Sequence, residues 1–184
     1  MDRFFLSRDE SVLVIIDIQE RLAAAMKERE TVITNTLHLI EAARLLQIPL
    51  IVTEQYPKGL GPTVKEIKDS LVDNYRAIEK ITFSCCGDNT FIDSLKGIGR
   101  KRVIICGMET HVCVLQTCFD LLKENFFVHV VKDAVCSRSE DNFMTGIDLM
   151  RDAGAVITST ETVLFQLLKR AGTEEFKAIS RMIK

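Results

Sequence analysis

Residues 12–16 read VLVII, a run of five aliphatic side chains that ends at the carboxylate of Asp17. A short apolar run without polar alternation is typical of a strand that is buried on both faces of a parallel sheet. Similar or shorter runs recur along the chain, namely PLIV at 49–52, RAIEKI at 76–81, RVIIC at 102–106, FFVHVV at 126–131 and AVIT at 155–158. The sequence therefore predicts six strands.

Segments with helical periodicity lie between the predicted strands. Apolar residues repeat at helical spacing at positions 33, 37 and 40, and again at 112, 115, 119 and 122. The last two helices are expected at about 162–171 and 174–183. Strand and helix that alternate in this way predict an α/β fold, a three-layer αβα sandwich in which helices cover both faces of a parallel sheet.

The chain of 184 residues, 47% of them hydrophobic, can bury a sizeable core without a metal or disulfides. No repeat or long linker divides it, so we expect a single domain over residues 1–184. Lysine and arginine number 24 against 26 aspartate and glutamate, and the basic residues are scattered along the chain. This balance argues against nucleic acid as a partner.

No apolar run approaches the roughly 18 residues that cross a bilayer. The first ten residues, MDRFFLSRDE, have neither the apolar core of a signal peptide nor the Arg-rich character of a transit peptide. We therefore expect a soluble cytoplasmic protein without a membrane partner, and leave a mitochondrial or other organelle location open. In such a compartment the six cysteines are expected to be reduced thiols.

One stretch interrupts the alternation of strand and helix. Residues 54–76 open with two prolines and two glycines within six positions, which predicts a long loop before a short helix. Long ordered loops often carry function, so this segment is a candidate wall or lid of a pocket. A plain solvated surface loop is the alternative that the sequence leaves open.

Three residues stand at or just after the ends of predicted strands, where open parallel sheets bind their ligands. Asp17 ends the most apolar strand, Lys80 belongs to the short strand at 76–81, and Cys113 follows the strand that ends at Cys106. An aspartate in this place can also cap a turn, and a strand-end lysine is usually just solvated. A lysine stem is nevertheless long enough to reach across neighbouring strands to the carboxylate.

The position of Cys113 distinguishes it from the other cysteines. It lies in the first turn of a helix expected to begin near His111 or Val112, where the positive helix end stabilises a thiolate. We therefore expect Cys113 to be the nucleophile and to react with alkylating reagents at pH values below the roughly 8.5 of a free cysteine. Cys106, Cys118 and Cys136 are interpreted as buried and inert, and Cys85 and Cys86 as residues of a turn.

No metal site is expected. The sequence has no C-x-x-C pair, and its three histidines, His38, His111 and His129, are far apart. We interpret His38 and His129 as ordinary helix and strand residues, and His111 as a surface or interface residue. Neither a metal nor another cofactor is therefore predicted.

Four segments together resemble the isochorismatase-like hydrolases. They read VIIDIQERL at 14–22, TEQYPKGLGPTV at 53–64, EKITFSCC at 79–86 and GMETHVCVLQT at 107–117. The resemblance extends over nearly the whole chain. Within this superfamily the sequence is most similar to the group called isochorismatase domain-containing proteins. Its motifs are specific, because an Asp-x-Gln strand end, a strand-end lysine and a G-x-x-T-x-x-C-V turn rarely coincide.

The resemblance implies a Rossmann-like six-stranded parallel sheet of order 3-2-1-4-5-6, a homo-oligomer, and a catalytic triad of Asp17, Lys80 and Cys113. It also implies a non-proline cis peptide between Met108 and Glu109. Relatives that have the cysteine include nicotinamidases and other amidohydrolases, which cleave C–N bonds through a thioester.

The sequence departs from the nicotinamidases in one respect. These relatives bind a metal through an Asp-x-His and a later histidine after the second strand. The corresponding region here begins at Thr53, Glu54, Gln55 and Tyr56 and contains no histidine before His111. The resemblance therefore makes nicotinamide a weak candidate substrate and does not restore a metal site.

The function expected from the sequence is hydrolysis of an amide or ureido C–N bond in a small molecule. Asp17 takes the thiol proton, Lys80 holds the carboxylate ionised, and backbone N–H groups of Glu109 and Cys113 bind the oxyanion. Gln19, Tyr56 and Phe83 are candidate substrate contacts. Two rivals stay open: an ether hydrolase that does not acylate Cys113, and a catalytically idle oligomeric scaffold.

Overall fold

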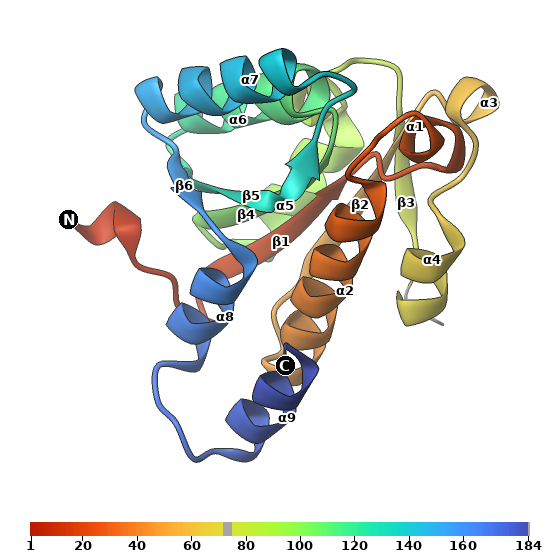
Figure 1. The fold of residues 1–184 in the computed structure, drawn as a ribbon. Coiled ribbons are helices and arrows are strands. Elements are labelled where there is room, and N and C mark those ends of the chain that lie inside the picture. Colours follow the sequence, from red (N-terminus) through yellow and green to blue (C-terminus); the bar gives the residue numbers. More distant parts are fainter. Residues whose placement is uncertain (72–74, 184) are drawn as a thin grey trace.

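Six parallel strands form one sheet in the computed structural model, which describes residues 1–71 and 75–183 (Figure 1). All six predicted strands are present, and the predicted order is confirmed as β3-β2-β1-β4-β5-β6. The strands are β1 Ser11–Ile16, β2 Leu50–Gln55, β3 Ala77–Lys80, β4 Arg102–Met108, β5 Phe127–Cys136 and β6 Val156–Thr158.

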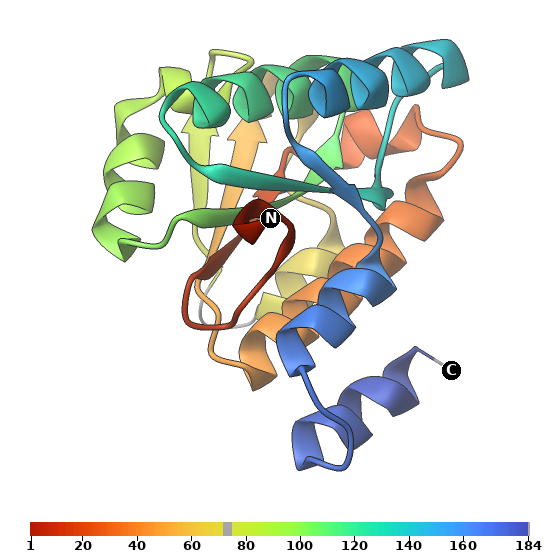
Figure 2. The ribbon, with the colours of Figure 1, turned by 90° about the vertical axis from the view of Figure 1, so that its left-hand side faces the viewer.

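Helices cover both faces of this sheet, which confirms the α/β, Rossmann-like fold. They are α1 Glu20–Ala24, α2 Arg29–Leu45, α3 Pro57–Leu60, α4 Lys65–Leu71, α5 Asn89–Ile98, α6 Leu115–Lys123, α7 Glu140–Asp152, α8 Thr160–Leu168 and α9 Glu174–Met182. Figures 1 and 2 show α6 and α7 on one side of the sheet, and α2, α8 and α9 on the other. Side-chain oxygens of Asp88, Ser139, Ser159 and Thr173 cap the helices α5, α7, α8 and α9.

Strand β1 is buried along its whole length, as its unbroken apolar run predicts. Leu13 and Ile15 pack into the core formed with α2 and α8, whereas Val12, Val14 and Ile16 pack into the core formed with α5, α6 and α7. Successive side chains of a strand point to opposite faces, so a strand between two helical layers must be apolar at every position.

The carboxyl ends of four neighbouring strands meet at one edge of the sheet. Ile16 of β1 pairs with both Thr53 of β2 and Gly107 of β4. Gln55 at the end of β2 pairs with Lys80 at the end of β3. This register brings the residues that follow β1, β2, β3 and β4 close together, although they are far apart in the sequence.

Two segments differ from the sequence-based expectation. Strand β5 continues past the polar residues Lys132 and Asp133, because its pairing with β4 resumes after a register shift and ends with Met108 opposite Cys136. Residues 54–76 are not mainly a loop: they complete β2 and then form α3 and α4, and residues 72–74 of this segment lie outside the described residues.

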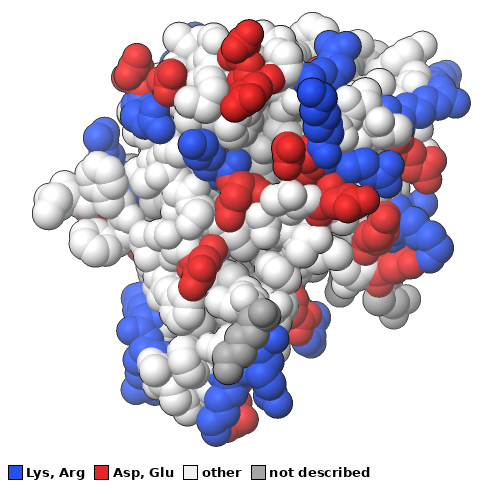
Figure 3. All heavy atoms as spheres, in the orientation of Figure 1, with Lys and Arg blue, Asp and Glu red and all other residues white. Residues whose placement is uncertain are grey.

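Charged side chains of both signs are interspersed on the face shown in Figure 3. No large patch of one sign is visible there, in keeping with a formal net charge of −2. Within residues 1–71 and 75–183, no helix is long and apolar enough to cross a membrane.

Candidate active site

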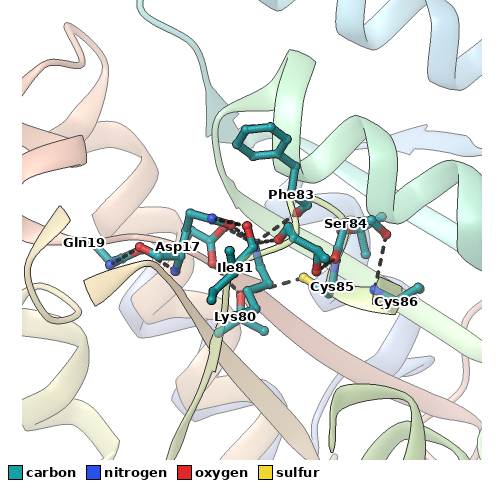
Figure 4. Close-up of polar contacts among 12 residues, drawn as sticks. Asp17, Gln19, Lys80, Ile81, Phe83, Ser84, Cys85 and Cys86 are labelled. Carbon is teal, nitrogen blue, oxygen red and sulfur yellow. Dashed lines mark hydrogen bonds and ion pairs between the residues drawn. The ribbon is translucent and has the colours of Figure 1, made fainter. Parts of the chain in front are cut away.

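A buried ion pair lies at the carboxyl edge of the sheet. Lys80 Nζ donates to Asp17 Oδ2 at 2.7 Å, and both side chains are fully shielded from solvent (Figure 4). Asp17 follows β1 with a φ of 52°, a left-handed conformation that turns the chain sharply away from the strand. The lysine stem crosses from β3 past β2 to reach it, so this part of the expected arrangement is present.

Four further groups hold this pair in place. The Thr53 hydroxyl donates to the other carboxylate oxygen of Asp17 at 2.7 Å. Lys80 Nζ also donates to Gln55 Oε1 at 2.8 Å and to the backbone carbonyls of Phe83 at 3.0 Å and Thr82 at 3.3 Å. Because hydrogen bonds offset the cost of burying a charge, the pair can stay ionised in the interior.

The ammonium of Lys80 remains charged despite its burial. Desolvation alone would lower its pKa, but the charge of Asp17 and the hydrogen bond to that carboxylate oppose this effect, and the pKa of Lys80 is raised. The raised pKa favours the positively charged form of Lys80 beside the carboxylate.

Gln19 is a structural clamp beneath the site. Its side-chain amide donates to the carbonyls of Gln55 at 3.0 Å and Gly61 at 2.6 Å and accepts from the Gln55 amide at 2.7 Å. These contacts tie the segment after β1 to the end of β2, while Gln19 itself is completely buried. Gln19 was expected to contact substrate, but its side-chain amide is used in these contacts and it does not line the cavity described below.

Cys113 lies in the wide turn η4, Thr110–Val114, which connects β4 to α6. The peptide bond between Met108 and Glu109, directly before this turn, is cis, as the resemblance implied. The thiol is 4% exposed and belongs to the core cluster beneath α6 and α7. Both the sequence and the structure therefore place Cys113 after β4, although in a wider turn than the first turn of a regular helix.

The pKa of Cys113 is shifted upward, opposite to the direction expected from its place in the sequence. Burial raises the pKa of the thiol, and the charge of Asp17 and hydrogen bonding to that carboxylate raise it further, whereas Lys80 opposes them. The nearby Cys85 thiol, which lies 3.7 Å from the Thr53 hydroxyl, also has its pKa raised by burial, to about 11. A second anion beside the Asp17 carboxylate is unfavourable, and the raised pKa of Cys113 favours a neutral thiol before the reaction.

The upward shift of the Cys113 pKa gives a testable expectation for alkylation by iodoacetamide. Because the pKa of Cys113 is raised, its thiolate is populated only at high pH, and the midpoint of the native alkylation rate should lie above the roughly 8.5 of a free cysteine. The rates would be measured by mass spectrometry from pH 6 to 10, with the urea-unfolded chain as control. A native midpoint below that of the unfolded chain would restore the thiolate assignment.

A cavity of about 350 Å³ opens above Cys113. Its apolar lining consists of Leu22, Ala25, Leu60, Phe83 and Val112, and its polar lining of Arg21, Gln55, Glu109, Cys113 and Arg138. Of the three expected substrate contacts, only Phe83 lines it. Tyr56, whose φ is 39°, is 54% exposed and is not among the lining residues.

Residues 54–76 form part of the cavity wall through Gln55 and Leu60, so the wall that was expected there is present. Sequence reasoning missed Arg21 and Arg138. Arg21 follows Gln19 by two residues within the VIIDIQERL motif, which could have drawn attention to it. Arg138 had no such signal, because only tertiary contacts bring the end of β5 to the cavity.

Glu109 and Arg138 form a second ion pair at this cavity. Glu109 accepts from the backbone N–H of Arg138 at 2.9 Å and from its Nε at 3.2 Å. The carboxylate is 7% exposed and the arginine 64%, so the pair reaches from the interior to the surface. Arg138 therefore brings little uncompensated charge to the cavity.

Metal ligands do not cluster in the described part of the chain. No group of three or more His, Cys, Asp or Glu side chains with suitable spacing occurs in residues 1–71 and 75–183. The six cysteines are free, and five of them are buried. His111 belongs to the wide turn η4, is half-buried, and forms a hydrogen bond with the Ser137 hydroxyl at 2.9 Å.

The fold and the site define an α/β enzyme-like protein whose cavity lies at the carboxyl edge of a Rossmann-like sheet. The isochorismatase domain pattern matches residues 11–162, and relatives are 34% to 43% identical over most of the chain. The chain therefore belongs to the isochorismatase family, within the isochorismatase-like hydrolase superfamily.

Two curated relatives illustrate this membership. The secreted isochorismatase effector Isc1 of Phytophthora sojae is 43% identical over 95% of this chain and 84% of its own length. Isochorismatase domain-containing protein 2 of Danio rerio is 38% identical over 97% of this chain and 89% of its own length. The likeness to the isochorismatase domain-containing group is confirmed.

Two solved structures are similar to this fold. One is described as the MAR1 ribonuclease from Caenorhabditis elegans, with a TM-score of 0.91, 41% identity, and coverage of 97% of this chain and 92% of that one. The other is YcaC from Pseudomonas aeruginosa with hexane-2,5-diol and covalent acrylamide, with a TM-score of 0.90, 26% identity, and coverage of 97% and 91%.

Proposed function

We propose that this protein is a cysteine-dependent hydrolase that cleaves an amide or ureido C–N bond of a small molecule through a thioester. The observation that carries the proposal is the Asp17–Lys80 pair, joined at 2.7 Å, beneath a cavity that Cys113 lines. A nucleophile, a base and a charge that orients the base are the parts that covalent acyl transfer needs.

The proposed reaction begins from a neutral thiol. Asp17 accepts the proton of Cys113 as the sulfur attacks the carbonyl carbon, and it returns that proton to the departing amine. A water molecule, activated by the same carboxylate, then hydrolyses the thioester and restores the thiol. Lys80 stays charged throughout, so that it favours ionised Asp17 before the attack and orients the carboxylate by its hydrogen bond.

The negative charge that develops on the carbonyl oxygen needs donors close to the thiol. We propose the backbone N–H groups of Glu109, which directly precedes the turn η4, and of Cys113, which lies within it. In other enzymes one such donor contributes roughly 3 to 4 kcal/mol to the transition state. The turn thus joins the nucleophile and the oxyanion donors in one short segment.

One comparison supports a reactive nucleophile in this fold. The YcaC structure is described with covalent acrylamide, so that protein forms a bond with a small unsaturated amide. At 26% identity it supports a chemistry for this chain but not a substrate. Ribonuclease action, named for the nematode structure, is not favoured here, since the chain is acidic overall, with a net charge of −2.

The test is a turnover screen over small amides, ureido compounds and enol ethers, with wild type and the Cys113→Ala variant. Cys86→Ala is a matched control, because Cys86 sits in the turn η3, Cys85–Gly87, away from the cavity lining. We expect turnover of a C–N substrate by wild type and by Cys86→Ala, and none by Cys113→Ala. Intact-mass analysis of a quenched reaction should reveal an acyl adduct on Cys113.

Two rivals predict other results in the same screen. Turnover of an enol ether without an adduct on Cys113 would favour the ether hydrolase, and absence of turnover in every class would favour the idle scaffold. Turnover that survives in Cys113→Ala would remove the proposed nucleophile. The homo-oligomeric state and the cytoplasmic location stay predictions.

A further inference from the structure

We propose that Arg21 binds an anionic group of the substrate, so that the site takes small carboxylates with an apolar body whose acyl carbon reaches Cys113. This inference rests on the proposed function, because it concerns the same cavity. It adds the class of substrate and a residue that selects it, and neither is settled by the Asp17, Lys80 and Cys113 arrangement.

The position of Arg21 is fixed by the segment after β1. Arg21 lies in the short helix α1 and its Nη1 donates to the Gly59 carbonyl at 2.9 Å. Its stem runs beside Gly61, where an added Cβ would lie 3.9 Å from Arg21 Cγ. One N–H is thus used to hold the guanidinium at the rim of the cavity, which leaves its other donors for a ligand.

Among the described residues, the charges around the cavity leave one cation without a partner. Three charged side chains line it, namely Arg21, Glu109 and Arg138, and the last two pair with each other. Within residues 1–71 and 75–183, no acidic side chain lies within ion-pair distance of Arg21. Asp17 and Lys80 beneath the cavity compensate each other as well.

This balance of charges decides whether the preferred ligand is an anion or a cation. The cavity has an excess of one positive charge at its rim, and a planar guanidinium with free N–H groups matches the two oxygens of a carboxylate. A cationic ligand would meet an uncompensated like charge there. An anionic ligand would instead complete the pairing.

The remaining lining residues determine the polarity of the rest of the ligand. Leu22, Ala25, Leu60, Phe83 and Val112 form most of the wall, so the atoms between the anionic group and the acyl carbon are expected to be apolar. With about 350 Å³ available, the ligand is a small molecule and not a polymer. The exposed Arg21 and the buried Cys113 both line this cavity, so that one ligand can contact both of them.

The test compares two alkylating reagents that differ only in charge. Iodoacetate carries a carboxylate, and iodoacetamide has the same size but is neutral. The ratio of their rates at Cys113 cancels any change in ionisation of the thiol. We expect Arg21→Gln to lower the ratio of the iodoacetate to the iodoacetamide rate about fivefold, the effect of about 1 kcal/mol from one exposed charge.

Arg151→Gln is the matched control, because Arg151 is an exposed arginine of α7 that does not line the cavity. It should leave the ratio unchanged, and 0.5 M NaCl should reduce the wild-type ratio toward that of Arg21→Gln. An equal ratio in wild type and Arg21→Gln would overturn the inference. The nucleophile of the proposed function is judged separately, by turnover of Cys113→Ala.

A second measurement covers the case in which neither reagent labels the thiol. Binding of 4,4,4-trifluorobutanoate and 4,4,4-trifluorobutanamide would be followed by fluorine NMR in the Cys113→Ala variant, where no covalent step occurs. The carboxylate should bind about fivefold more tightly than the amide, and Arg21→Gln should abolish this preference. Equal binding of the two compounds to the Cys113→Ala variant that retains Arg21 would overturn the inference.

Discussion

Replacing Lys80 by methionine should destabilise the protein by about 3 to 5 kcal/mol at pH 7, because it leaves Asp17 as a buried carboxylate without a counter-charge. Methionine has a similar length, so the packing of the stem is largely kept. The lost contacts are the 2.7 Å ion pair to Asp17 and the donations to Gln55 and to the backbone carbonyls of Thr82 and Phe83. The thiol also loses the one nearby charge that lowers its pKa.

The loss should depend on pH. The isolated carboxylate can relieve its burial by taking up a proton in the folded state, which happens more readily in acid. The folded variant then binds more protons than the unfolded chain, so its stability falls as the pH rises. Urea unfolding of wild type and variant at pH 5 and pH 8 should therefore show the larger difference at pH 8.

Two controls separate this effect from a general loss of side-chain contacts. Lys65→Met removes an exposed pair with Asp69, in which the lysine side chain is 80% exposed, and should cost less than about 1 kcal/mol. The double variant Asp17→Asn, Lys80→Met removes both charges and should recover much of the loss. A cost of less than about 1 kcal/mol for Lys80→Met alone would mean that the pair is not buried as described.

Gly107→Ala should destabilise the protein by about 2 to 6 kcal/mol, since strain at a disfavoured φ and overpacking each cost of order 1 to 3 kcal/mol. Gly107 has a φ of +135°, which alanine adopts only with strain. A Cβ there would lie 2.0 Å from the carbonyl oxygen of Ile16 on the neighbouring strand. That atom is backbone at the centre of the sheet, so it cannot move aside as a flexible side chain would.

The control for this prediction is Gly97→Ala. Gly97 is an exposed residue near the end of α5, and an added Cβ would meet no atom within 4 Å. This change should stabilise the protein by about 0.5 to 1 kcal/mol, because alanine favours the helix. Thermal and urea unfolding would measure both variants, and a Gly107→Ala protein as stable as wild type would show that β1 and β4 do not approach so closely.

Much of the fold follows from local patterns in the sequence. Every residue of VLVII at 12–16 is apolar, and a strand between two helical layers admits nothing else, so β1 was identified without structural information. The approach of Asp17 to Lys80 could be anticipated for the same reason, because parallel strands end at a common edge and a lysine stem spans the distance between strands. The strand order came from family resemblance, since periodicity does not specify which strands are neighbours.

The tertiary structure decided what local patterns could not. The pKa of Cys113 depends on its burial and on the charge of Asp17, which act on the thiol only once η4 packs beneath α6 and α7, and they shift it opposite to the sequence-based expectation. Gln19 was expected to face substrate, yet Gln55 and Gly61 occupy its hydrogen-bonding groups. Arg21 and Arg138 come from distant segments, so their shared cavity was invisible in the sequence. A sequence carries the periodicity and charge of each segment, whereas solvent exposure and the pairing of charges depend on which surfaces meet when those segments pack.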